Sequence, residues 1–223
     1  MSVLVYKDAE SVGKAAATII AGNLMVDPYA NIGLTYDSLL EPVFCELSSM
    51  LNSGLFSFQR SRIYQLCEFV PSNDDTVSMF HLLHEAFLKN ASISEDQYII
   101  PYMPDRNWAQ ICSDFENDIL DHGGLDLTIL ALKPDGSVLY NMPGNDLAPV
   151  THVEKIADEK VVSAGMSTIM RSKRLLVVAT GDSCANSVAH SLGGGVNADL
   201  PFSYLQMHRN ITFILDEKAA SLL

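Results

Sequence analysis

The run of residues 125–132 constrains the fold of this chain more than any other segment, because it is apolar apart from Asp126 and Thr128. A strand with apolar residues on both faces is typical of a parallel sheet, since helices cover both faces of such a sheet. We therefore predict that residues 125–132 form a strand near the centre of a parallel sheet.

The rest of the chain alternates short runs rich in β-branched residues with longer segments of helical apolar spacing. After Asp8, a helix cap, apolar residues recur at the spacing of one helix face: Val12, Ala15, Ala16, Ile19 and Ile20. The other predicted strands are residues 3–6, 31–34, 62–66, 175–180 and 211–215. This pattern predicts the α/β class: a three-layer, doubly wound, mainly parallel sheet of Rossmann-like type, forming one domain over residues 1–223.

Further helices are predicted between these strands. One covers residues 38–51 and stops at Gly54. A polar break at residues 71–75 precedes helices that carry Phe80, Leu83 and Phe87, then Trp108, Ile111, Cys112, Phe115 and Ile119, and later Ala185, Val188, Ala189 and Leu192. In doubly wound sheets ligands bind beyond the carboxyl ends of the strands, so the loops after Leu34, Leu66, Leu132 and Thr180 are the candidate site.

Composition limits the classes of function. Acidic residues outnumber basic ones by 27 to 14, and the resulting net charge of −13 opposes nucleic-acid binding. The four cysteines form no CxxC pair, which favours reduced thiols in the cytoplasm over disulfides or a metal site. The amino terminus has neither a basic leader nor an apolar run long enough to span a bilayer. We expect no metal, cofactor, nucleic-acid or membrane partner, and leave a homo-oligomer open.

Three segments are candidates for chemistry, each with a plainer structural interpretation. Asp135 and Gly136 form a tight turn or part of a ligand loop. The segment TGDSCANS is predicted to begin a helix. Its backbone amides either bind an anion or donate to an ordinary N-cap side chain. His81 and His84 share a predicted helix without a third metal ligand. No P-loop, GxGxxG motif or serine-nucleophile elbow is present.

The segment GGLDLTILALKPDGSVLYNMPG, residues 123–144, resembles the glucosamine-6-phosphate isomerase/deaminase family in the order and spacing of its residues. The segments SFQRSRIYQLCEFV, LLVVATGDSCA and LPFSYLQMHRNITFILDE add to this resemblance, which spans nearly the whole chain. The related 6-phosphogluconolactonases are less similar, because Asn141, Pro143 and Gly144 match the isomerase loop. The resemblance implies the family's α/β fold and a sugar-phosphate ligand.

The same resemblance places the departures of this chain on the family's catalytic positions. Cys67, beside Glu68, stands where the family has the aspartate that moves a proton between sugar carbons. Asp135 is kept, but Ser137 replaces the histidine that assists ring opening, and Met142 replaces the glutamate that supports it. The resemblance therefore implies catalytic positions at Cys67, Glu68, Asp135 and Ser137 without the usual base.

The family's phosphate-binding positions differ as well. Thr35, Tyr36, Asp37 and Ser38 replace a glycine-containing loop, and Cys184 replaces a lysine. Asp37 adds a side chain and a negative charge where glycine would let the backbone close on an anion. We therefore expect weak binding of phosphate at these substrate-binding positions.

Two classes of function follow from these departures. In the first, favoured one, the chain is a diverged homologue that lacks the standard deaminase activity and acts as a metabolite-binding or assembly protein, with a small sugar or sugar phosphate as ligand. In the second, it is an active sugar-phosphate isomerase of carbohydrate metabolism with an altered substrate and altered catalytic residues. Loss of one positioned acid or base lowers a rate by about 10² to 10⁴, which favours the first class.

Overall fold

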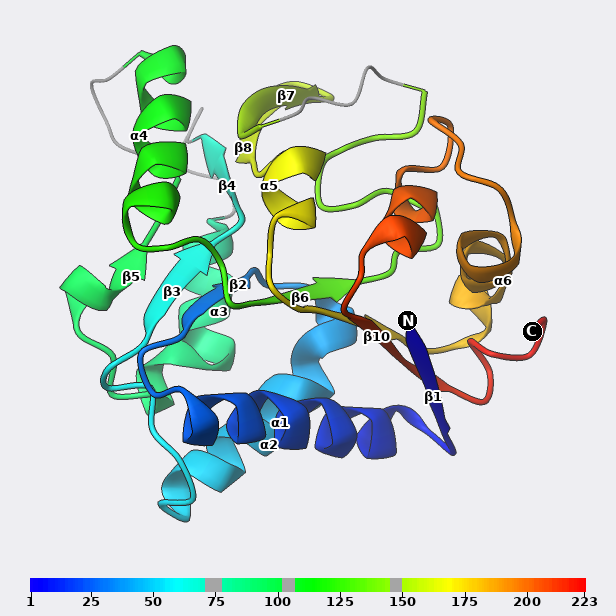
Figure 1. Ribbon diagram of the computed structural model, residues 1–223, viewed down its shortest axis with the longest axis horizontal. Coiled ribbons are helices and arrows are strands. Elements are labelled where there is room, and N and C mark those ends of the chain that lie inside the picture. The colour runs from blue at the N-terminus through cyan, green and yellow to red at the C-terminus, as the bar shows by residue number, and fades with distance from the viewer. Residues whose placement is uncertain (71–77, 102–106, 145–149) are drawn as a thin grey trace.

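A seven-stranded parallel sheet forms the centre of the computed structural model, which describes residues 1–70, 78–101, 107–144 and 150–223 (Figure 1). The strand order is β1-β10-β9-β6-β2-β3-β5. The strands are β1 (Ser2–Tyr6), β2 (Asn31–Leu34), β3 (Arg62–Gln65), β5 (Tyr98–Ile99), β6 (Leu127–Ala131), β9 (Leu175–Ala179) and β10 (Ile211–Asp216). The parallel α/β prediction is confirmed, and β6 occupies the middle of the sheet as its apolar sequence predicts.

Helices cover both faces of this sheet. In Figure 1, α1 (Ala9–Val26) and α2 (Glu41–Asn52) lie below it, whereas α4 (Trp108–Asp121), α5 (Met166–Met170) and α6 (Ala185–Gly193) lie above it. The shorter α3 (Met79–Ala86) contributes Leu83 to the same core as α1 and α2. Single turns of 3-10 helix occur at Ser38–Leu40, Leu88–Asn90, Glu95–Gln97 and Asp182–Cys184, and a longer 3-10 segment at Pro201–Met207.

Alternation along the strands divides the apolar residues between two cores. In β9, Leu176 and Val178 pack with α1 and α2, whereas Leu175, Val177 and Ala179 pack with α4, α5 and α6. All five residues of β9 are buried. Such a strand reads as a continuous apolar run because each face has its own helix layer.

A second sheet was not predicted from the sequence. It has three antiparallel strands in the order β4-β8-β7, formed by β4 (Cys67–Val70), β7 (His152–Ile156) and β8 (Glu159–Ser163). Only Leu66 separates β3 from β4, so the chain passes directly from the large sheet into the small one. Ala157, at a positive φ of 54°, joins β7 to β8.

The single helix predicted for residues 38–51 is wrong at its start. Asp37 caps the 3-10 turn Ser38–Leu40 by accepting a hydrogen bond from the Leu39 amide, and α2 begins only at Glu41. Pro42 explains the break, because proline has no N–H for a helical hydrogen bond and is tolerated only in the first turn. The predicted cap at Asp8 is confirmed by its hydrogen bond from the Ser11 amide. The polar break at residues 71–75 lies outside the described residues.

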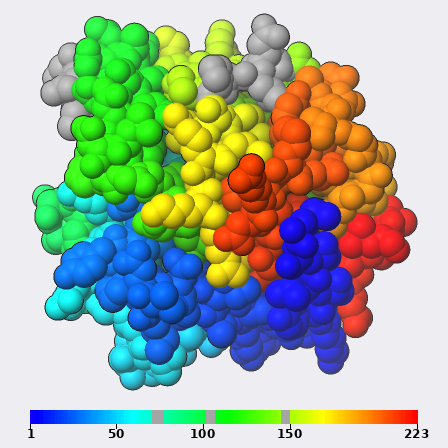
Figure 2. Space-filling view, viewed as in Figure 1, coloured from blue at the N-terminus to red at the C-terminus, as the bar shows by residue number. Residues whose placement is uncertain are grey.

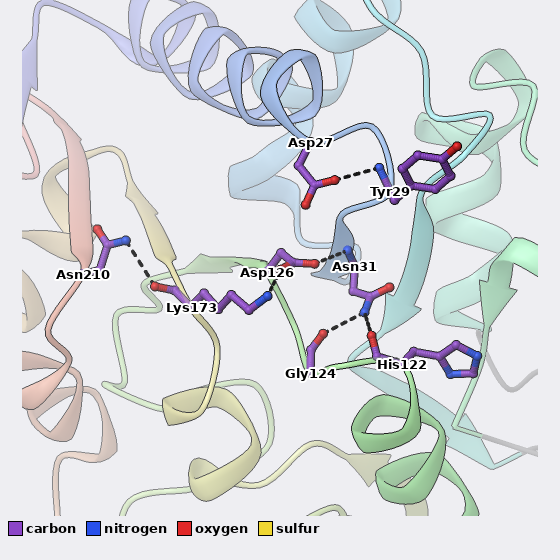
Figure 3. A network of polar contacts seen from close by, with 8 residues as sticks. All are labelled: Asp27, Tyr29, Asn31, His122, Gly124, Asp126, Lys173 and Asn210. Carbon is purple, nitrogen blue, oxygen red and sulfur yellow. Dashed lines mark hydrogen bonds and ion pairs between the residues drawn. The ribbon is translucent and has the colours of Figure 1, made fainter.

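Polar contacts join the amino ends of the central strands (Figure 3). The Asp126 carboxylate accepts hydrogen bonds from the Asn31 amide, at 2.7 Å, and from the Lys173 ammonium, at 2.6 Å. The Asn31 side-chain amide donates to the carbonyls of His122 and Gly124. Residues 122–126 therefore connect the amino ends of β2, β6 and β9, at the sheet edge opposite the candidate loops.

A glycine sets the distance between α1 and α2. A Cβ atom at Gly13 would lie 2.7 Å from the carbonyl carbon and oxygen of Pro42, which is backbone and cannot move aside easily. Among the described residues, no helix is long and apolar enough to cross a membrane.

We expect Gly13→Ala to destabilise the protein by about 1 to 3 kcal/mol, because the added methyl forces α1 away from α2. Gly22→Ala is the matched control, because Gly22 lies in the same helix with no atom within 4 Å of an added Cβ. Its higher helix propensity should stabilise the protein by up to about 1 kcal/mol. Denaturant unfolding of both variants measures the difference, and equal stabilisation by both would contradict the close contact.

Candidate functional site

A cavity of about 290 Å³ lies at the carboxyl ends of β2, β3 and β6. Its walls come from the loop after β2, the start of β4, one face of α3 and the segment after β6. The lining residues are Thr35, Tyr36, Asp37, Ser38, Cys67, Phe69, Met79, Leu82, Ala131, Lys133, Leu139 and Tyr140. The candidate loops named from the sequence also lie at this edge of the sheet, where parallel strands bring their loops together.

Cys67 lies on the floor of this cavity and is 1% exposed. Its Sγ is 3.1 Å from Thr35 Oγ1, an arrangement in which either atom can donate the hydrogen bond. Burial raises the pKa of the Cys67 thiol to about 12, although the Thr35 hydroxyl and the Lys133 charge both favour the thiolate. The thiol therefore stays protonated at neutral pH and cannot accept a proton as the family's aspartate would.

We expect alkylating reagents to leave Cys67 unmodified in the folded protein between pH 7 and pH 9, because only the thiolate reacts and the thiol is buried. Cys45 is exposed and serves as the internal control, since it should react within the same sample. Mass spectrometry after brief labelling measures both sites. Modification of Cys67 as fast as Cys45 would show that the thiol is accessible and acidic.

The loop after β2 is built around Asp37 and Tyr36. The Asp37 carboxylate accepts a hydrogen bond from the Leu39 amide, at 3.0 Å, which caps the following 3-10 turn, and Asp37 also lines the cavity. The Tyr36 hydroxyl donates to the Glu41 carboxylate, and this hydrogen bond raises the pKa of Tyr36 to about 12. Ser38 lines the same wall. The loop presents hydroxyl groups and one carboxylate to the cavity.

Glu68 is next to Cys67 in sequence, but its carboxylate lies outside the cavity lining. It is 3% exposed and accepts hydrogen bonds from Gln65 Nε2 and from the backbone amides of Phe69, Met79 and Phe80. The last two amides belong to the first turn of α3, where a carboxylate is favoured by the helix dipole. Glu68 therefore holds α3 against β4 and has little capacity left for proton transfer.

Asp135 and Ser137 also lie outside the cavity lining. The exposed Asp135 carboxylate accepts hydrogen bonds from the amide and the hydroxyl of Ser137, at 2.9 and 2.7 Å. Gly136 has a positive φ of 74°, and an added Cβ would meet Leu200 at 2.5 Å. Met142, at the position of the family's glutamate, is half-buried. The segment thus forms a self-contained turn packed on residues near the carboxyl end of the chain.

Cys184 is fully buried and donates its S–H toward the Leu132 carbonyl, 3.4 Å away. It does not line the cavity, and burial raises the pKa of its thiol. The Gly181 amide before it donates to the Asp216 carboxylate. Of the TGDSCANS amides that could have met an anion, this one already has a partner within the protein.

Lys133 and Tyr140 are site residues that the sequence analysis missed. Lys133 Nζ lies 4.8 Å from the centroid of the Tyr140 ring, and Tyr140 packs edge to face against Phe69 with 5.5 Å between centroids. Burial raises the pKa of the Tyr140 hydroxyl. Lys133 is the first charged residue after the apolar run at residues 125–132, a position in sequence that could have indicated a strand-end side chain.

Other candidates from the sequence lie elsewhere. His81 is exposed, and His84 contacts Glu85 while lining a separate cavity of about 530 Å³ on the other side of α3. Within the described ranges, no group of His, Cys, Asp and Glu side chains has the arrangement of a metal site.

Comparison with known proteins decides the family. Residues 7–214 match the family described as glucosamine-6-phosphate isomerases/6-phosphogluconolactonase. The chain belongs to this family. The match confirms the resemblance predicted from the sequence, which likewise spans nearly the whole chain.

Two curated family members are glucosamine-6-phosphate deaminases from Halothermothrix orenii and Clostridium perfringens strain 13, which are 28% and 27% identical to this chain over 241 residues. In both cases the alignment covers 100% of each protein. A monomeric glucosamine-6-phosphate deaminase of known structure superposes with a TM-score of 0.93 at 26% identity, covering 100% of both chains. The 6-phosphogluconolactonase from Trypanosoma brucei, at 18% identity and a TM-score of 0.81, shares the fold.

Proposed function

We propose that this family member binds a small sugar-like metabolite at the strand-end cavity without catalysing the deaminase reaction. The observation that carries the proposal is Cys67. The family resemblance places Cys67 at the position of the proton-shuttling aspartate. Its thiol is buried against Thr35, and burial raises its pKa to about 12. A group that must take up and return a proton near neutral pH works best with a pKa near the operating pH.

The surrounding residues support the same proposal. Glu68 is occupied by the first turn of α3, and Asp135 by Ser137. Ser137 has no ionisable group with which to assist ring opening. The cavity nevertheless remains open, and a volume of about 290 Å³ is at the lower end of small-molecule sites, which suits a monosaccharide-sized ligand.

The alternative function is that of an isomerase with altered catalytic residues. One observation supports it, because Asp37 places a carboxylate in the cavity lining. Its hydrogen bond from Leu39 fixes this group as a cap, although one oxygen can still face a ligand. An Asp37-dependent isomerisation of an unphosphorylated hexose would support the alternative.

The test is a panel of hexoses, hexosamines, sugar acids and their 6-phosphates, with binding measured by calorimetry and turnover by product analysis of the same mixtures. We expect at least one compound to bind with no compound consumed. Ala131→Phe, which should fill the cavity floor, is the matched control and should abolish the binding. Turnover of any member at rates typical of enzymes would overturn the proposal.

A further inference from the structure

The cavity contains a positive charge whose purpose within the protein is unexplained. Lys133 follows the central strand β6 and lines the cavity beside Cys67 and Tyr140. Its side chain is half-buried, so its ammonium group has lost part of its contact with water. Such a loss is normally offset by an opposite charge.

No carboxylate forms an ion pair with Lys133 in the part of the chain that the structure describes, although Asp37 lines the same cavity. Other lysines form ion pairs with carboxylates, at 2.6 Å for Lys14 and Lys173 and 3.0 Å for Lys89. The described contacts of the Lys133 ammonium are the Leu139 carbonyl, at 3.4 Å, and the face of the Tyr140 ring. The ring fixes the ammonium in position without neutralising it, because a cation–π contact leaves the N–H groups free to donate elsewhere.

The other cavity residues indicate which anion would fit. Thr35 and Ser38 supply hydroxyl groups, whereas the Tyr36 hydroxyl is bound to Glu41, and the rings of Phe69 and Tyr140 supply apolar surface. Asp37 adds a negative charge to the same cavity, so a phosphate dianion would meet one cation and one anion. A carboxylate carries a single charge and needs only one ammonium partner.

We propose that Lys133 binds the carboxylate of a small polyhydroxylated monocarboxylic acid in the strand-end cavity. This inference rests on the proposed binding function and specifies its ligand class. The carboxylate lies against the Lys133 ammonium, the hydroxyl groups face Thr35 and Ser38, and the C–H face of the ligand packs on Phe69 and Tyr140. The anion thereby binds at Lys133 and not at residues 35–38 or Cys184, the phosphate-binding positions that the family resemblance implies.

Calorimetry with D-gluconate, D-glucuronate, D-glucose and D-glucose 6-phosphate tests the inference on the full chain. We expect at least one of the two acids to bind more tightly than glucose or glucose 6-phosphate. Lys133→Met should weaken binding of that acid by about tenfold to a hundredfold, the effect of losing a charge-assisted hydrogen bond, while Lys133→Arg should retain most of it. For the unmodified protein, affinity for the acid should fall as salt is raised.

Lys160→Met is the matched control. Lys160 also places its ammonium near an aromatic ring, 5.9 Å from the centroid of Trp108, but it is exposed and lies outside the cavity lining. The Lys160→Met substitution changes the net charge by the same amount as Lys133→Met and should leave acid binding unaltered. A circular dichroism melt shows whether each variant is folded.

The possible outcomes distinguish failure of this inference from failure of the proposed function. Equal binding of glucose and its acids, or unchanged acid binding in folded Lys133→Met, would overturn the role of Lys133 while leaving a binding protein. If Lys133→Met is unfolded, two other results would overturn the role of Lys133. One is acid binding by the unmodified protein that does not change with salt, and the other is loss of acid binding in folded Lys133→Arg. Binding of no compound would overturn both, and turnover of glucosamine 6-phosphate would overturn the proposed function alone.

Discussion

Glucosamine 6-phosphate should release no ammonia when it is incubated with this protein, beyond the rate in buffer. The family resemblance places the buried thiol of Cys67 at the position of the base, and Ser137 and Met142 at the ring-opening and supporting positions. One positioned acid or base contributes about 10² to 10⁴ in rate, so loss of two should lower turnover by at least about 10⁴. A coupled ammonia assay at high protein concentration measures the remaining rate.

The deaminase from Halothermothrix orenii provides the positive control, because it aligns with this chain from end to end. Both proteins should be assayed under the same conditions, with heat-treated samples to define the background. Ammonia release by this chain at about 1 to 10³ per second, the usual range for enzymes, would show that another group performs the proton transfer.

Glu68→Ala should lower the free energy of unfolding by about 3 to 5 kcal/mol, since buried donors left without an acceptor cost about 1 to 3 kcal/mol each. The substitution leaves Gln65 and the amides of Met79 and Phe80 without this carboxylate, and it also leaves a cavity beneath α3. Urea unfolding followed by circular dichroism measures the loss.

Glu85→Ala is the control for this experiment, because Glu85 is an exposed residue of α3, the helix that Glu68 contacts. Its ion pair with Lys89 lies at the surface, where such pairs add little to stability. The unfolding midpoint should therefore barely move. A comparable loss in both variants would mean that the buried Glu68 contributes no more to stability than an exposed glutamate does.

The sequence predicts the large sheet well because burial on two faces leaves a continuous apolar run. Residues 125–132 and 175–180 could only lie between two helix layers, and the structure has β6 and β9 there. The small sheet was missed because β4 follows β3 after one residue, so the two strands appear in the sequence as one run. The β7–β8 hairpin turns at Ala157, which has a positive φ without the glycine that usually marks such a turn.

The site was predicted in part. The loop at residues 35–38 and Cys67 line one cavity, as expected from the carboxyl ends of neighbouring strands. The contacts of Glu68 and Lys133 could not be inferred, because no spacing in the sequence indicates them. Glu68 meets the amides of α3 only after β4 forms, and Lys133 meets Tyr140 only when the turn between them closes.

The pairing of β1 has a consequence for synthesis on the ribosome. In the space-filling view β1, in dark blue, lies at the surface beside the red carboxyl-terminal segment, and its partner in the sheet is β10, which pairs Ser2 with Thr212 (Figure 2). At about 5 to 20 residues per second, roughly 10 to 40 s separate the appearance of the two strands. Throughout that interval Val3, Leu4 and Val5 lack their partner, and a nascent-chain chaperone has its longest opportunity to bind them.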